Sequence, residues 1–322
     1  NKTNWTNQDI ELKVKGKDDL SGPLGVKKDI DTDYTENLTS VVTNNGTYNF
    51  DVIDNAGNEN NCEVEVTKID KTKPVIKSAS ASTEWTYEFK KITINSSDGE
   101  SGLAGYQITN SLEEPSVFIK NESETVESSL KYGNGTYYVW VKDKASNISD
   151  PVAVNVTNID RTKPIITYSL EPNDEWNNQD INVLIQAKDD ESQIKSLKYC
   201  LTNSVKECVP NIDGNINGQT VKIENDGDKY QICSIAVNNA SLETQTCTSY
   251  DSKYYKLDKT YPSCELTVDN EACTNKSITA SISGTDDLSG LNNAPYAIND
   301  DNFTTNNTKL ITSNGTIIGK VK

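Results

Sequence analysis

The sequence of 322 residues contains no histidine and no methionine, and only 7% of its residues are aromatic. Histidine is the commonest general base and transition-metal ligand, so its absence excludes Ser-His catalytic triads and zinc sites with histidine ligands. Without methionine the chain cannot include its own start codon, so we expect a longer parent protein. Apolar runs of about 18 residues are also missing, which predicts no membrane-spanning helix in this segment.

The chain is acidic, with 48 Asp and Glu residues against 31 Lys and Arg residues and a formal net charge of -17. The acidic residues are spread along the chain rather than gathered in a tail. Such a surface repels nucleic-acid phosphates, so we expect no nucleic-acid partner. Hydrophobic residues make up only 34% of the chain, which suits several thin β-sandwiches better than one large core.

A set of short motifs recurs in the same order along the chain. A Trp-containing segment, NWTNQDI at 4–10, returns as EWNNQDI at 175–181 and more loosely at 84–86 and 272–278. An N-G-T-Y motif or a variant of it follows each copy by 40 to 50 residues, and three copies continue through a D-x-A-G-N turn to an I-D-K-T-x-P segment. Recurrence at this spacing predicts tandem repeats of one structural unit of about 90 residues.

Between the motifs the hydrophobic pattern has a period of two residues. Apolar and polar residues alternate over 10–15, 48–52 and 62–66. This alternation is typical of half-buried strands with one wet face, and turn residues separate the strands at short intervals. We therefore predict an all-β fold, a tandem array of antiparallel β-sandwiches with about seven strands each.

The motifs together resemble those of bacterial immunoglobulin-like repeats, which occur in tandem on extracellular surface proteins and adhesins. The resemblance covers the whole chain and implies four immunoglobulin-like repeats, the first without its first strand and the fourth truncated at its C-terminal end. Their expected bounds are 1–69, 70–159, 160–257 and 258–322. Three departures from the pattern are Gln193 in place of Gly, Asn238 in place of Asp, and Cys273 in place of Trp.

The seven cysteines are distributed unevenly among the repeats, with even numbers in the third and fourth. These even numbers predict three local disulfides, Cys200 with Cys208, Cys233 with Cys247, and Cys264 with Cys273. Closing a loop of about 15 residues stabilises a domain by about 3 kcal/mol, and such bonds suit an extracellular setting. The alternative is that the cysteines are small buried hydrophobic residues. We expect this of Cys62, because it shares a strand face with Val64 and Val66.

Paired acidic residues precede a turn in every repeat, as DDLSG at 18–22 and 286–290 and in looser form at 98–102 and 189–192. The resemblance implies that this loop, the D-x-A-G-N loop and the entering I-D-K-T-x-P segment meet at one end of each domain. The carboxylates expected to converge are Asp70, Asp98 and Asp143 in the second repeat, Asp160, Asp189 and Asp190 in the third, and Asp258, Asp286 and Asp287 in the fourth. Three carboxylates with loop carbonyls could bind calcium, with the third repeat the weakest candidate.

Turn chemistry gives a second interpretation of the same residues. Asp at the first position of a turn accepts hydrogen bonds from the backbone that follows it, and Gly supplies a positive φ. Both interpretations remain open at the level of the sequence.

The tryptophans divide into two groups. Trp5, Trp85 and Trp176 recur at one position of the repeat, so we expect them to cover a core edge. Trp140 lies on the strand face opposite Val139 and Val141, so we expect it to be exposed and to be a candidate contact residue.

These observations favour a non-enzymatic spacer over an enzyme, because the features that recur from repeat to repeat are turns rather than a unique pocket. We expect an extracellular stalk of a bacterial surface protein, in which each repeat contacts its neighbours and calcium stiffens the joints. One alternative is an adhesin that binds a host glycan or protein through the third repeat, which carries an insertion at 210–218. Another is an accessory region of a larger secreted enzyme.

Overall fold

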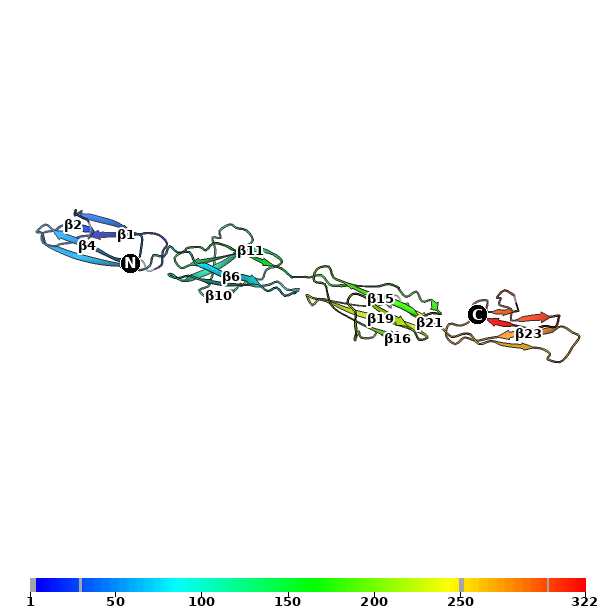
Figure 1. Cartoon of the computed structure of the whole chain (residues 1–322). Helices are drawn as coiled ribbons and strands as arrows, with labels where there is room; N and C mark the ends of the chain where they lie inside the picture. The colour runs from blue at the N-terminus through cyan, green and yellow to red at the C-terminus, as the bar shows by residue number, and fades with distance from the viewer. Residues whose placement is uncertain (1–3, 29–30, 249–251, 300) are drawn as a thin grey trace. The chain divides into compact units, whose positions relative to one another are not determined.

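The computed structural model describes residues 4–28, 31–248, 252–299 and 301–322 (Figure 1). The described residues form strands and turns and contain no helix. They therefore contain no candidate membrane-spanning helix. The chain divides into two compact units, Asn1–Ile159 and Asp160–Lys322. That division falls at the expected boundary between the second and third repeats.

The first repeat packs a two-stranded sheet, β1-β3, against a three-stranded sheet, β2-β4-β5. Its strands are β1 (Ile10–Lys15), β2 (Pro23–Lys28), β3 (Asn37–Val42), β4 (Gly46–Asp54) and β5 (Glu59–Val66). All pairings are antiparallel. Val14, Val26 and Phe50 come from both sheets and form one of its buried clusters.

The second repeat contains a three-stranded sheet, β10-β7-β6, and a four-stranded sheet, β12-β11-β8-β9. The strands are β6 (Val75–Ala81), β7 (Ile92–Ser97), β8 (Leu103–Thr109), β9 (Ile119–Lys120), β10 (Thr125–Glu127), β11 (Gly135–Asp143) and β12 (Val152–Val156). In β7 every second side chain is buried, and Ile92 and Ile94 are 0% exposed. Burial of each such side chain contributes about 1.5–3 kcal/mol, so the period of two residues fixes which face meets the other sheet.

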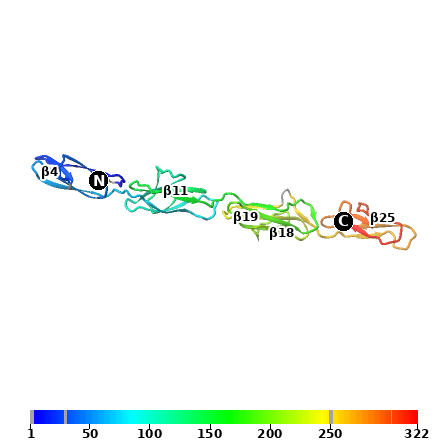
Figure 2. The same cartoon turned by 45° about the horizontal axis from the view of Figure 1, so that its top comes forward.

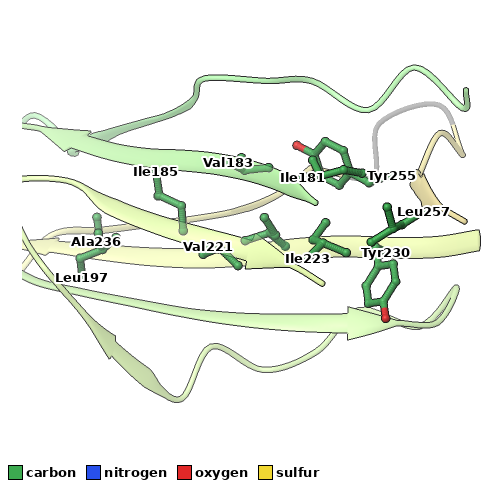
Figure 3. Packing of buried hydrophobic residues seen from close by; sticks show 11 residues of the cluster. Ile181, Val183, Ile185, Leu197, Val221, Ile223, Tyr230, Ala236, Tyr255 and Leu257 are labelled. Atoms are coloured by element: carbon green, nitrogen blue, oxygen red, sulfur yellow. The ribbon is translucent and has the colours of Figure 1, made fainter. Parts of the chain in front are cut away.

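The third repeat is built around one extended cluster of buried hydrophobic residues (Figure 3). Its sheets are β13-β15-β18 and β14-β21-β19-β16-β17, with β20 also paired to β19. The strands are β13 (Ile165–Tyr168), β14 (Trp176–Asn177), β15 (Ile181–Lys188), β16 (Ile194–Asn203), β17 (Ile212–Gly214), β18 (Gln219–Ile223), β19 (Gly227–Asn238), β20 (Glu243–Cys247) and β21 (Tyr255–Leu257). Figure 3 shows Val183 and Ile185 of β15 on the same side as Val221 of β18, directed toward the second sheet.

The fourth repeat pairs β22-β23-β25 in one sheet and β24-β26 in another (Figure 2). Its strands are β22 (Glu265–Val268), β23 (Ile278–Ser283), β24 (Tyr296–Ile298), β25 (Thr308–Ile311) and β26 (Gly319–Val321). Ala280, Ile282 and Ile298 form a small core between them. All four repeats are therefore β-sandwiches of the immunoglobulin-like kind, as the alternation in the sequence predicts, and their strands pair antiparallel except for β14 with β21.

Two expectations about single side chains are wrong. Trp140 is only 5% exposed, because β11 is flanked by two strands and the indole Nε1 donates a hydrogen bond to Thr109 Oγ1 of β8 at 3.0 Å. Cys62 is exposed rather than buried. It lies on β5, the edge strand of its sheet, so its side chain stays uncovered although its register partner Phe50 on β4 is fully buried.

Candidate metal site where each repeat begins

The repeated motifs meet where the chain leaves one repeat and enters the next. Asn45 of the first N-G-T-Y motif holds both backbone groups of Ile69, with Nδ2 donating to the Ile69 carbonyl at 2.8 Å and Oδ1 accepting from its N–H at 2.7 Å. Asn134 holds Ile159 in the same way, at 2.8 and 3.1 Å. The motif therefore anchors the exit of the chain from its domain.

The Trp-containing segment holds the next residue, which we call the junction aspartate (Asp70, Asp160 or Asp258). Thr6 forms a parallel bridge with Ile69, and the Asp70 N–H donates to the Thr6 carbonyl at 2.9 Å. The Asp258 N–H donates to the Asn177 carbonyl at the same distance. The backbone of each of these two aspartates is thus bonded to the repeat that precedes it.

The carboxylate of a junction aspartate reaches forward into the repeat that follows. The Ser101 N–H donates to Asp70 Oδ2 and the Ser289 N–H donates to Asp258 Oδ2, both at 3.0 Å. The Ser192 hydroxyl donates to Asp160 Oδ2 at 2.5 Å. The structure therefore brings the entering segment and the D-x-x-S-G loop together in the second, third and fourth repeats.

In the second repeat all three expected carboxylates converge. Asp70, Asp98 and Asp143 each offer an oxygen within 4.8 Å of the other two, and Asp70 and Asp143 are 1% exposed. At that separation two unit charges repel by about 3 kcal/mol at an effective dielectric constant of about 20. Burial is the main cause that raises the pKa of Asp143. Hydrogen bonds from Asn147 oppose it, and the charges of Asp70 and Asp98 add a smaller increase.

The hydrogen bonds around this cluster leave two buried oxygens without a partner. Asp98 Oδ2 accepts from the Gly102 N–H at 2.7 Å, and Asp143 accepts from both the backbone and the side chain of Asn147. Asp98 Oδ1 and the hydroxyl oxygen of Ser101, a residue only 5% exposed, have no hydrogen-bond partner. Unpaired buried oxygens beside three carboxylates fit a hard cation that takes oxygen ligands, such as calcium.

In the third repeat an amide takes the place of the third carboxylate. Asp160 and Asp189 converge, and Asn238 Nδ2 lies 3.0 Å from Asp160 Oδ2 and 3.0 Å from Asp189 Oδ2. Burial acts to raise the pKa of Asp160, but hydrogen bonds from Ser192 and Thr162 outweigh it and lower that pKa to about 2. The Asp160 carboxylate in turn raises the pKa of the neighbouring, exposed Glu191.

Asp190 does not belong to this cluster. Its exposed side chain forms an ion pair with Lys188 at 2.8 Å. The first Asp of the pair turns inward to accept hydrogen bonds from the loop, so the second points to solvent.

The fourth repeat follows the same rule with two carboxylates. Asp286 accepts from the Gly290 N–H at 2.8 Å, whereas the side chain of Asp287 is exposed and lies outside the cluster. For Asp258, burial is outweighed by hydrogen bonds from Thr260 and Ser289, which lower the pKa to about 2.

Turn chemistry accounts for much of the acidic motif, as the second interpretation predicts. Asp18 Oδ2 accepts from the backbone N–H groups of Ser21 and Gly22 at 2.7 and 2.8 Å, while Asp19 forms an ion pair with Lys17. Gly22 has a φ of 76°, in the left-handed region. Gln193 adopts a φ of 66° at the equivalent position, where a side chain is strained.

The cysteines form two of the three expected disulfides, Cys200–Cys208 and Cys233–Cys247. The second joins directly paired residues of β19 and β20. Cys264 and Cys273 are exposed and are not bonded to each other. Cys264 precedes β22 and Cys273 follows its end in the loop before β23, so the strand separates them.

Three features of the site are not predicted from single motifs. The sequence does not predict Asn147 or Ser101 as members of the site. It marks Asn238 only as a departure from the D-x-A-G-N motif. The signal that could have found Asn147 is the recurrence of Asn at the last position of D-x-A-G-N, where Asn58 makes the same bond to Asp54 at 2.7 Å.

Comparisons with known proteins add little to this description. No family model matches the chain, and a search of curated proteins returned no match. Among solved structures, the chain is similar to a mutant of Salmonella alpha-2-macroglobulin with 9% identity and a TM-score of 0.16. The alignment covers 98% of this chain and 26% of that one, so the chain spans about a quarter of its length. At that TM-score the likeness supports no argument about function.

Proposed function

We propose that this chain is a spacer of bacterial immunoglobulin-like repeats in an extracellular surface protein, and that a calcium ion bound by Asp70, Asp98 and Asp143 stiffens the junction before the second repeat. The single observation that carries the proposal is the junction aspartate, which is bonded on both sides. The Asp70 N–H is held by Thr6 of the first repeat, and its carboxylate accepts from Ser101 of the second. A junction without spare residues suits a load-bearing spacer better than a flexible linker.

Ion pairs add to two of the junctions. Lys71, the residue after Asp70, pairs with Asp9 of the first repeat, and Lys259 pairs with Asp180 of the third at 2.9 Å. Exposed pairs of this kind contribute little stability, about 0–1 kcal/mol each. Their role here is to fix the direction in which the chain leaves a domain.

The two disulfides of the third repeat support an extracellular location. Disulfides persist in oxidising compartments and are rare in reduced cytosol. They also reinforce a thin domain against unfolding under load, because each bond limits how far its loop can extend.

The donor set favours a hard cation such as calcium over the transition metals that take nitrogen or sulfur ligands. The cluster offers carboxylate oxygens and a serine hydroxyl, without nitrogen or sulfur ligands. Calcium accepts six to eight such oxygens in flexible geometry, whereas transition metals prefer nitrogen or sulfur ligands. Asp70, Asp98 and Asp143 would hold the ion, and its charge would offset the repulsion among them.

The spacer is tested by small-angle X-ray scattering of the full chain in calcium and in EGTA. The proposal predicts that the wild type is an elongated particle in calcium and a more flexible one in EGTA. The Asp98→Asn variant in calcium should give the same profile as the wild type in EGTA. A profile of one compact globule, or profiles that are identical in the two buffers, would contradict the spacer and the calcium joint respectively.

Adhesion through the third repeat is the second candidate, because the segment at the Cys200–Cys208 bridge exposes apolar side chains. Val205, within the loop that the disulfide closes, is 65% exposed, and Val209, the residue after Cys208, is 80% exposed. Apolar side chains held exposed on an anchored loop favour contact with a partner.

This candidate is tested with immobilised oligosaccharides and extracellular-matrix proteins. The full chain is compared with a Val205→Lys/Val209→Lys variant and with a Leu112→Lys control, which changes another exposed apolar residue in the second repeat. Binding that only the first variant loses would support adhesion, and equal binding by all three chains would refute it.

A further inference from the structure

The clusters of the second and third repeats differ at two positions of the same turn. Asp143 of the second repeat corresponds to Asn238 of the third, and Asn147 corresponds to Leu242. In the second repeat, Asn147 Nδ2 lies 2.7 Å from Asp143 Oδ2 and 2.9 Å from the Asp70 carbonyl. The amide is therefore engaged at the edge of the cluster, by one carboxylate and by the main chain.

In the third repeat the amide has moved to the centre of the cluster. Asn238 is fully buried, and its Nδ2 lies 3.0 Å from a carboxylate oxygen of Asp160, from one of Asp189 and from the Thr162 carbonyl. The orientation of this amide is fixed, because its Oδ1 accepts from the Leu242 N–H at 2.8 Å. The positive end of the amide dipole thus lies between two carboxylates.

The serine of the D-x-x-S loop differs between the repeats in a matching way. The Ser192 hydroxyl of the third repeat donates to Asp160, whereas the buried Ser101 hydroxyl of the second has no partner. Asp98 Oδ1 is also unpaired, while both carboxylate oxygens of the equivalent Asp189 accept hydrogen bonds. The cluster of the third repeat is saturated and that of the second is not.

We infer that the Asn238 amide occupies the place of the cation in the third repeat, so that the second repeat depends on calcium at its start and the third does not. The inference rests on the calcium site proposed above. Asn238 reduces the number of aspartates in the cluster from three to two, which lessens the repulsion. Its amide donors and the Ser192 hydroxyl also leave no unpaired oxygen of the kind that calls for a metal in the second repeat.

The two turns can be exchanged within the same chain. Asn238→Asp with Leu242→Asn gives the third repeat the turn of the second, and Asp143→Asn with Asn147→Leu does the reverse. Calcium chloride is titrated into each full-length chain by isothermal calorimetry. We expect the first double variant to bind one ion more than the wild type, and the second double variant to bind one ion fewer.

Two further variants separate failure of the inference from failure of the calcium site itself. Asp98→Asn should lose one ion, and a wild type that binds no calcium would overturn the proposed site and this inference together. Asn238→Leu removes the amide without adding a carboxylate, so it should bind as many ions as the wild type. If Asn238→Leu binds one ion fewer, or if Asn238→Asp/Leu242→Asn gains none, the inference alone is wrong.

Hydrogen exchange in EGTA supplies a readout that does not depend on ion counting. Asn238→Asp/Leu242→Asn should speed exchange of the Ser192 and Thr162 amides several-fold, because a third carboxylate replaces the donor between Asp160 and Asp189. Added calcium should restore the protection in that variant and leave the wild-type rates at these amides unchanged. Unchanged exchange in the variant would overturn the inference.

Discussion

The hydroxyl of Ser192 is the most sharply testable contact at the start of the third repeat. It donates to Asp160 Oδ2 at 2.5 Å in a fully buried setting and is 3.4 Å from Asp189 Oδ1. A hydrogen bond to a buried charge contributes about 1.5–3 kcal/mol, so Ser192→Ala should destabilise the third repeat by about 2 kcal/mol at neutral pH. The matched control is Ser101→Ala, which removes a hydroxyl without a partner and should cost well under half as much in EGTA.

The pH dependence of that loss follows from the pKa of Asp160. The pKa of this carboxyl is lowered from 3.8 to about 2 in the folded chain, so the unfolded chain binds the proton more readily and the ionised form stabilises the fold above about pH 4. This contribution, about 2 kcal/mol, disappears as the pH falls through 2. The difference between wild type and Ser192→Ala should therefore be constant from pH 7 to pH 5 and shrink below about pH 4.

The free energy of unfolding of the third repeat is measured by urea denaturation, with hydrogen exchange of its core strand β15 as the readout. A loss for Ser192→Ala that equals the loss for Ser101→Ala would refute the difference between the two clusters. A loss that stays constant down to about pH 2 would refute the role of the Asp160 charge.

Three further changes test the rest of the account. Gln193→Gly relieves a positive φ and should stabilise the third repeat by roughly 0.5–1 kcal/mol in urea denaturation, whereas Gln193→Ala should not. Reduction of Cys233–Cys247, whose partners are 14 residues apart, should cost about 3 kcal/mol, and an unchanged midpoint after reduction would contradict this. Asn134→Ala removes both hydrogen bonds to Ile159 and should cost about 1–3 kcal/mol, seen as faster exchange of the Ile159 amide; an unaltered rate would disprove the clamp.

The fold was predictable because its signals are local. Alternation over 48–52 fixes which side chains of β4 face inward, and glycine at a positive φ marks the turns. Motif order then places the junction aspartates beside the D-x-x-S-G loops. The convergence of Asp70, Asp98 and Asp143 follows from topology alone, without knowledge of any side-chain rotamer.

The remaining features depend on contacts that a sequence pattern does not contain. By its place in the alternating pattern, Trp140 should lie on the solvent face of β11. It is buried, because burial depends on what covers that face and on the hydrogen-bond partner Thr109. Asp190 and Asp287 fit the paired-aspartate motif as well as Asp189 and Asp286 do. The turn nevertheless directs only the first Asp of each pair inward. Asn238 stands out as a departure, but its bonds to two carboxylates appear only when three loops are brought together.

The central claim, that calcium holds the start of the second repeat, is tested most directly by hydrogen exchange of the wild-type chain in calcium and in EGTA. Segments 70–74 and 98–103 should exchange more slowly in calcium, because the ion would bind Asp70 and Asp98 together. Segments 160–164 and 189–193 of the same molecule should not respond, since Asn238 already joins them. Equal rates at 70–74 and 98–103 in the two buffers would contradict the account.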